Sequence, residues 1–124
     1  MMLAACNETK APPEPEQERA GVQKISAAEA RGMMQELQAF TLLDVRTENE
    51  FRERRLKGAI LIPDYELKAR AETELPDKGK PILVYCRSGR RSARAAEELI
   101  ALGYKKVYDF GGIASWSYEV VEGD

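Results

Sequence analysis

The stretch that decides the fold is PILVYCRSGRRS, residues 81–92. Its first five residues are apolar and lead directly to Cys86, a pattern that indicates a buried β-strand. After Ser92, apolar residues return at helical spacing up to about Leu102, and Gly103 suits the end of a helix. We therefore expect a strand, a tight loop that begins with a cysteine, and then a helix.

This loop predicts a reactive thiol. Gly89 lets the backbone curl so that successive N–H groups point inward, and the following helix adds the positive end of its dipole. Three arginines stand within five positions of Cys86, and together these groups favour the thiolate, the nucleophilic form of cysteine. A lone cysteine after a strand is more often a small buried apolar residue. Three arginines and a glycine serve no core, however, so the pattern predicts a nucleophile.

Three motifs follow one another along the chain: LDVR at residues 43–46, CRSGRRS at 86–92 and GGIASW at 111–116. In this order and at this spacing they resemble a single-domain rhodanese, a sulfurtransferase, over about residues 25–118. The resemblance implies an α/β fold with a mainly parallel central sheet and helices on both faces, and unbroken apolar strands alternating with helices agree with it. It also implies that Cys86 is catalytic and that the loop residues bind substrate and persulfide, namely Arg87, Ser88, Gly89, Arg90, Arg91 and Ser92.

The reaction implied by this resemblance is sulfur transfer in two steps. Cys86 takes the outer sulfur of a small anionic donor such as thiosulfate and holds it as a persulfide until a thiol, a cyanide-like acceptor or a protein removes it. One alternative is a sulfur-carrier or redox-sensing module that acts on one protein partner. Another is oxyanion chemistry like that of phosphatases and arsenate reductases. The spacing of Cys86 and Arg91 disfavours this oxyanion chemistry, because the two residues form Cys-x4-Arg, which is one residue shorter than the Cys-x5-Arg loop of those enzymes.

Composition limits the other functions. The 124 residues allow one domain with a modest core, and 19 basic against 21 acidic residues give a net charge of -2, which argues against a nucleic-acid binder. The chain has no histidine, which excludes Ser-His and Cys-His catalysis, and its two cysteines have no metal-binding spacing. We therefore expect no metal and no cofactor, and we expect a monomer.

The first 23 residues have the composition of a tether. Residues 11–18 are rich in proline and glutamate, which is typical of a flexible linker. Before them, LAAC at residues 3–6 resembles the lipobox of bacterial lipoproteins, in which the cysteine carries the lipid. We therefore expect residues 24–124 to form the rhodanese-like domain and Cys6 to be a lipid anchor in the cell envelope or periplasm. The lipid at Cys6 is the one expected link to a membrane. Without it, the alternative is a cytoplasmic protein.

Within the domain, two capping boxes predict helix starts, Ser26 with Glu29 and Thr47 with Glu50. The first helix is expected to end near residue 38. A third helix is expected after an N-cap at Asp64. The remaining expected elements are strands at 41–45, 58–62 and 106–109, and a last short helix at 113–119.

The other charged and glycine residues near the loop have expected structural roles. Asp44 and Arg46 flank a buried strand, so they should be paired or lie at its exit, and we expect Arg46 to pair with Glu50. Around the loop we expect Arg87 and Arg90 to face water and Arg91 to turn toward the bound anion. The GGIASW motif is expected to pack and turn tightly beside the loop through Gly111, Gly112 and Trp116.

Overall fold

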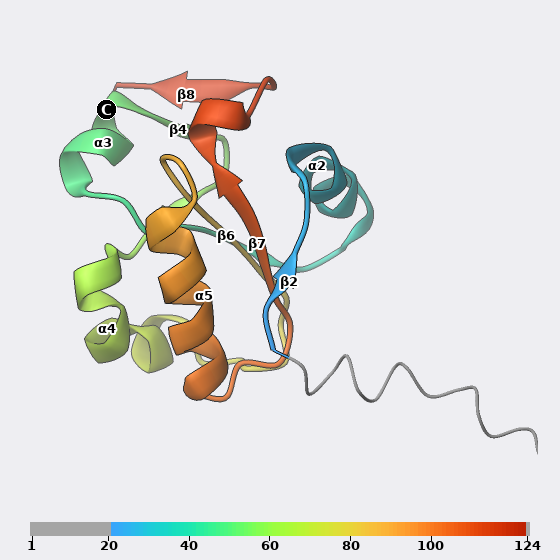
Figure 1. Ribbon diagram of the computed structural model, residues 1–124, viewed down its shortest axis with the longest axis vertical. Coiled ribbons are helices and arrows are strands. Elements are labelled where there is room, and N and C mark those ends of the chain that lie inside the picture. The colour runs from blue at the N-terminus through green and yellow to red at the C-terminus, as the bar shows by residue number, and fades with distance from the viewer. Residues whose placement is uncertain (1–20, 124) are drawn as a thin grey trace, which may run out of the picture.

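The computed structural model describes residues 21–123 and shows a central sheet of five parallel strands (Figure 1). In spatial order these strands are β2 (Gln23–Lys24), β7 (Val107–Gly112), β6 (Ile82–Cys86), β3 (Thr41–Asp44) and β5 (Ile60–Leu61). The strand that precedes the loop, β6, lies at the centre, and all of its residues are buried. The predicted α/β fold with a mainly parallel central sheet is confirmed.

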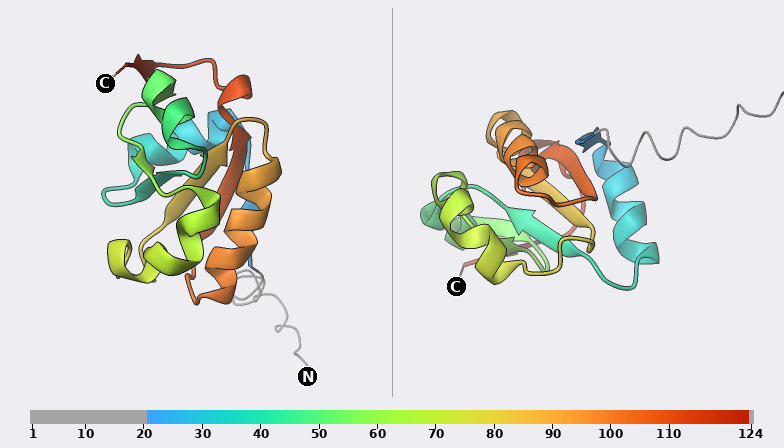
Figure 2. Two further views of the ribbon diagram at one scale, coloured as in Figure 1. Left: turned by 90° about the vertical axis from the view of Figure 1, so that its left-hand side faces the viewer. Right: turned by 90° about the horizontal axis from the view of Figure 1, so that it is seen from below.

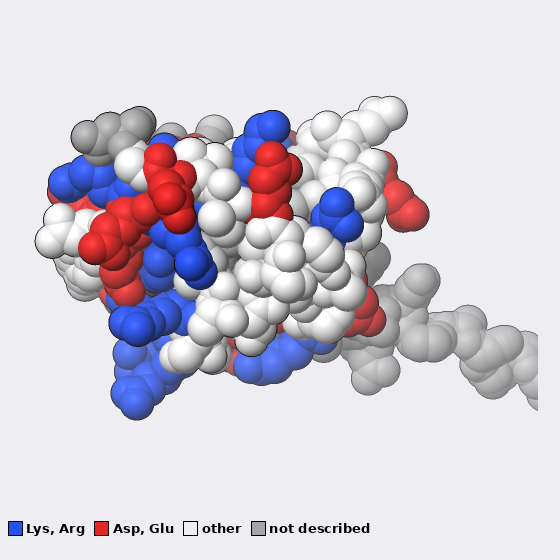
Figure 3. Space-filling view, turned by 90° about the horizontal axis from the view of Figure 1, so that it is seen from above, with Lys and Arg blue, Asp and Glu red and all other residues white. Residues whose placement is uncertain are grey.

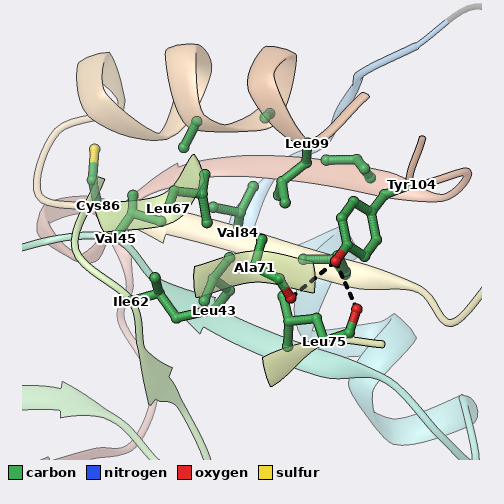
Figure 4. Close-up of a cluster of buried hydrophobic side chains, with 14 residues drawn as sticks. Leu43, Val45, Ile62, Leu67, Ala71, Leu75, Val84, Cys86, Leu99 and Tyr104 are labelled. Carbon is green, nitrogen blue, oxygen red and sulfur yellow. Dashed lines mark hydrogen bonds between the residues drawn. The ribbon is translucent and has the colours of Figure 1, made fainter. Parts of the chain in front are cut away.

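Helices cover both faces of this sheet (Figures 1 and 2). One face carries α4 (Leu67–Glu74) and α5 (Arg90–Ala101), and the other carries α2 (Ala27–Glu36). Side chains along a strand alternate between the faces, so Leu43 and Val84 lie in the core under α4 and α5 whereas Leu42 and Leu83 lie in the core under α2. Figure 4 shows the first of these cores, with β6 running through it toward Cys86.

Both predicted capping boxes are present. The Ser26 side chain accepts from the Glu29 N–H and opens α2, and the Thr47 side chain accepts from the Glu50 N–H and opens the short helix α3 (Glu48–Glu53). Gly103, at φ +101°, ends α5 as expected, with the Tyr104 N–H donating back to the Leu99 carbonyl. Local sequence signals therefore located these helix ends correctly.

Other boundaries differ from the prediction. Asp64 does not cap a helix, because it lies inside the 3-10 turn η1 (Asp64–Glu66), which begins after Pro63 and leads into α4. α5 starts two residues before Ser92. The expected last helix is only the turn η2 (Ile113–Ser115). It is followed by β8 (Val120–Glu122), which pairs antiparallel with β4 (Arg54–Leu56) in a small second sheet. Strands β2, β4 and β8 were not predicted.

The expected lipid anchor at Cys6 and the proline- and glutamate-rich linker lie outside the described residues, so both stay predictions. Between residues 21 and 123, every helix is too short or too polar to cross a bilayer.

Candidate active site

Cys86 is the last residue of β6, so it lies at the carboxyl end of the parallel sheet, where such folds bind their ligands. The Gly89 N–H donates to the Cys86 Sγ at 3.0 Å, which closes the loop around the sulfur atom. Figure 4 shows Cys86 at the end of the first core, beside the turn into α5. The residue is only 1% exposed. The predicted nucleophile therefore lies in a narrow cradle in which its sulfur is bonded to a backbone N–H group.

Two glycines give the loop its shape. Gly89 has a φ of +110°, in the left-handed region that favours glycine, and it immediately precedes α5. Because Gly89 has no side chain, none caps the N–H groups of the first turn of α5. From the β7 side, a Cβ on Gly112 would overlap the Arg87 carbonyl oxygen and crowd Ser88. The Ala114 N–H donates to the same Arg87 carbonyl at 3.1 Å, so the expected tight packing beside the loop is confirmed for the two glycines, whereas Trp116 packs against Phe110 and Tyr118.

Ser92 ties the loop to strand β7. Its side chain is fully buried, and its hydroxyl donates to Asp109 Oδ1 at 2.7 Å. Asp109, on β7, also accepts from the Gly111 N–H at 3.0 Å and from Lys24 Nζ at 3.4 Å. The hydroxyl of Ser92 is thus hydrogen-bonded within the protein, and its predicted contact with substrate stays a prediction. The role of Asp109 was not predicted from the sequence, although a carboxylate within a buried apolar strand was a usable signal.

Arg91 forms a bidentate ion pair with Glu50 on α3, with Nη1–Oε1 and Nη2–Oε2 distances of 2.9 and 3.0 Å. The pair, helped by the Thr47 N–H and hydroxyl, lowers the pKa of Glu50 to about 2. The pKa of Arg91 is raised, first by its hydrogen bonds to Glu50 and further by electrostatic interactions with Glu50, Cys86 and Asp64. Glu50 therefore holds the guanidinium of Arg91, a residue in the first turn of α5. Its contact with a bound anion stays a prediction.

The expected pair between Arg46 and Glu50 is wrong. Arg46 is 4% exposed and pairs with Asp44, with Nε–Oδ1 and Nη2–Oδ2 distances of 3.0 and 2.7 Å. Its Nη2 also donates to the Arg54 carbonyl at 2.6 Å, which joins the end of β3 to β4. The physical reason is that Arg91, at the start of α5, reaches Glu50 and binds its carboxylate. The structural role expected for Arg46 fits these contacts.

The remaining loop arginines face water. Arg87 and Arg90 are exposed, as expected. Arg87 also borders a shallow pocket of about 300 Å³ between the loop and α3, whose lining holds charges of both signs, from Arg46, Arg54, Glu50 and Glu53. In Figure 1 this region is the upper end of the molecule, where the loop between β6 and α5 lies beside α3. The guanidinium groups at this pocket can attract a small anion, and the uncapped start of α5 follows the same loop.

Comparison with known proteins gives one consistent result. A family model described as Rhodanese-like domain matches residues 26–119. Thiosulfate sulfurtransferase PspE of Escherichia coli (strain K12) is 38% identical over 81 residues, which cover 65% of this chain and 78% of that protein. Thiosulfate sulfurtransferase GlpE of Coxiella burnetii is 34% identical over 76 residues, which cover 60% and 69%.

Solved structures agree with the sequence relatives. A rhodanese with anions from E. coli superimposes with a TM-score of 0.64 at 38% identity, covering 68% of this chain and all of that one. A rhodanese-related protein from Thermoplasma volcanium gives a TM-score of 0.69 at 35% identity, covering 80% and 97%.

Proposed function

The chain belongs to the family of rhodanese-like domains, and from this premise we propose that it is a sulfurtransferase that carries sulfur on Cys86 as a persulfide. The enzyme class follows from the family and from relatives named thiosulfate sulfurtransferase. The observation that supports the persulfide most directly is the Gly89 N–H directed at the Cys86 Sγ at the end of β6. This N–H group can hold a negatively charged sulfur, which is what both steps of the reaction require.

In the first step, the Cys86 thiolate attacks the outer sulfur of thiosulfate. The sulfur–sulfur bond of the donor breaks, sulfite leaves with its electron pair, and a persulfide anion remains on Cys86. In the second step, a thiolate or cyanide attacks the outer sulfur of the persulfide, and the electron pair of the broken bond returns to the Cys86 Sγ. Neither step needs a proton donor, which suits a chain without histidine.

The burial of Cys86 fits a reaction in which a small donor loads the thiol and a separate acceptor removes the sulfur. The thiol is 1% exposed, so an attacking donor must enter the cradle. A persulfide carries its outer sulfur about 2 Å beyond the Sγ. The loaded form therefore presents its reactive atom to the acceptor better than the free enzyme presents its thiol.

The test is mass spectrometry of the protein after incubation with thiosulfate. We expect Cys86 to gain the mass of one sulfur atom, and cyanide to remove it with release of thiocyanate. Cys86→Ser keeps a small polar side chain in the cradle and should show no gain. If the wild-type protein gains no sulfur from any sulfane donor, the proposal is wrong.

A further inference from the structure

Helix α5 carries its charges in the reverse of the order that its dipole favours. Arg90, Arg91 and Arg94 lie in its first five residues, and Glu97 and Glu98 lie in its second half. Each cation near a helix N-terminus costs roughly 0.3–1 kcal/mol at an exposed position. α2 and α3 instead have acidic residues in their first turns. The arginines of α5 therefore do not serve the stability of the helix.

One of these three arginines forms an ion pair within the described part of the chain, and the other two do not. Arg91 is bound to Glu50. Arg90 and Arg94 are exposed, and their side chains make no hydrogen bond or ion pair with any residue between 21 and 123. Because they are four residues apart on a helix, the two like charges are neighbours on one face. Arg87 on the loop is exposed and equally unpaired among the described residues.

An exposed aromatic residue lies on an element that contacts α5. Tyr65, in η1, is 71% exposed, and it follows Asp64, whose charge acts on Arg91. η1 is also in contact with α5. Tyrosine and arginine are the residue types most enriched at the energetic centres of protein interfaces. Figure 3 looks onto the upper end of the molecule in Figure 1 and shows Lys and Arg gathered along one edge, with Asp and Glu beside them.

The surface extends beyond what thiosulfate needs. A small donor bound at Cys86 is reached by the loop, whereas Arg94 lies one helical turn, about 5 Å, farther along α5. Tyr65 adds apolar area that a small dianion does not use. A larger partner that brings its own negative charge would use both features.

We propose that Arg90, Arg94 and Tyr65 form a docking surface for a protein sulfur acceptor whose accepting cysteine lies among acidic residues. This inference rests on the proposed persulfide and names the class of acceptor that removes the sulfur. Opposite charges at the rim of a site speed the encounter and lose this effect in high salt. The unpaired arginines therefore act mainly on the association rate.

The test uses protein loaded with sulfur from thiosulfate and freed of donor, and two peptide probes with one cysteine each. In one peptide aspartate and glutamate flank the cysteine, and in the other asparagine and glutamine replace them. We expect the second-order rate of sulfur transfer at low salt to be about tenfold higher for the acidic peptide, and the difference to shrink in high salt.

The variants are Arg94→Glu and Tyr65→Ala, with Lys106→Glu as the matched control. Lys106 undergoes the same charge change, but it is exposed just before β7, at the amino end of the parallel sheet. Arg94→Glu should abolish the preference for the acidic peptide, Tyr65→Ala should reduce it about threefold, and Lys106→Glu should keep it. All three should still gain one sulfur from thiosulfate.

Each result decides a different proposal. Equal rates for the two peptides, or equal effects of Arg94→Glu and Lys106→Glu, would overturn the docking surface while persulfide formation stands. A protein that gains no sulfur at all would overturn the proposed function instead.

Discussion

The starts of α3 and α5 lie at the same end of the molecule and are built in opposite ways. α3 closes its own N-terminus, because the Thr47 side chain accepts from the Glu50 N–H and the Glu50 carboxylate accepts from the Thr47 N–H. α5 begins after Gly89, which offers no side chain, and no acidic residue follows in its first turn. Arginines stand there instead. The two starts are joined by the ion pair between Glu50 and Arg91.

The difference shows how one kind of structure serves stability in one place and chemistry in another. A capped start has its N–H groups satisfied and its dipole neutralised by its own carboxylate, so it has little left to offer an outside anion. The start of α5 has no such cap, so its N–H groups and positive dipole end can still act on an anion at the loop. Glu50 belongs to both starts, since it caps α3 and holds Arg91 beside the loop.

The substitution with the largest expected effect on stability and activity is Gly112→Ala. It disturbs the loop before α5 and leaves the capped start of α3 intact. The added Cβ would overlap the Arg87 carbonyl oxygen, so the backbone of the loop must move. We expect the free energy of unfolding to fall by about 1–3 kcal/mol. Persulfide formation should slow by about 100-fold, because the cradle around Cys86 loses its geometry. Urea denaturation and single-turnover loading with thiosulfate measure the two effects.

The control is Gly32→Ala, the same chemical change in the middle of α2. A Cβ at Gly32 meets nothing within 4 Å, and alanine is the better helix former by about 0.5–1 kcal/mol. This variant should be slightly more stable and fully active. Loading at the wild-type rate in Gly112→Ala would show that the loop does not depend on its contact with β7.

The parts of the fold that were predicted correctly from the sequence are those with local signals. The apolar run of β6, the two capping boxes and Gly103 are features of consecutive residues, and the structure has each of them. β4 and β8 were missed because their pairing joins Arg54–Leu56 to residues more than 60 positions later, and a strand that begins with two arginines has no apolar pattern.

The candidate site divides in the same way. The sequence indicated Cys86 and Gly89, because the loop that holds them is continuous in the chain. The partner of Glu50 was misassigned to Arg46, a residue only four positions away in the chain. Arg91 is 41 positions away and reaches Glu50 because β3 and β6 are neighbours in the sheet. Such a contact follows from strand order, which single-chain patterns do not give.

Glu50→Gln breaks the link between the two helix starts and should have the next largest effect. It removes the charge that binds Arg91 while keeping the size of the side chain. We expect a loss of about 1–2 kcal/mol in unfolding free energy at neutral pH, because the half-buried ion pair and its hydrogen bonds are lost. Sulfur transfer should slow by about tenfold as Arg91 loses its fixed position.

The effect depends on pH in a defined direction. Folding lowers the pKa of Glu50 from 4.5 to about 2, so its contribution is complete above pH 4.5 and is lost as the pH falls toward 2. The stability difference between wild type and Glu50→Gln should therefore shrink by more than half between pH 6 and pH 3. Glu48→Gln is the control, since the Glu48 side chain is 79% exposed and should change stability by less than about 0.5 kcal/mol. A pH-independent difference would show that charge on Glu50 is not what binds Arg91.

The smallest and sharpest comparison is between the two capping boxes, through Ser26→Ala and Thr47→Ala. Each variant removes the same side-chain acceptor from a helix start and should cost about 1 kcal/mol. Ser26 and Glu29 serve only α2, across the sheet from α5, so sulfur transfer should be unchanged. Thr47 donates to the carboxylate that holds Arg91, so its loss should also slow persulfide formation by about two- to fivefold. Equal rates in the two variants would mean that the cap of α3 contributes to stability alone, and that Arg91 keeps Glu50 in place without help from Thr47.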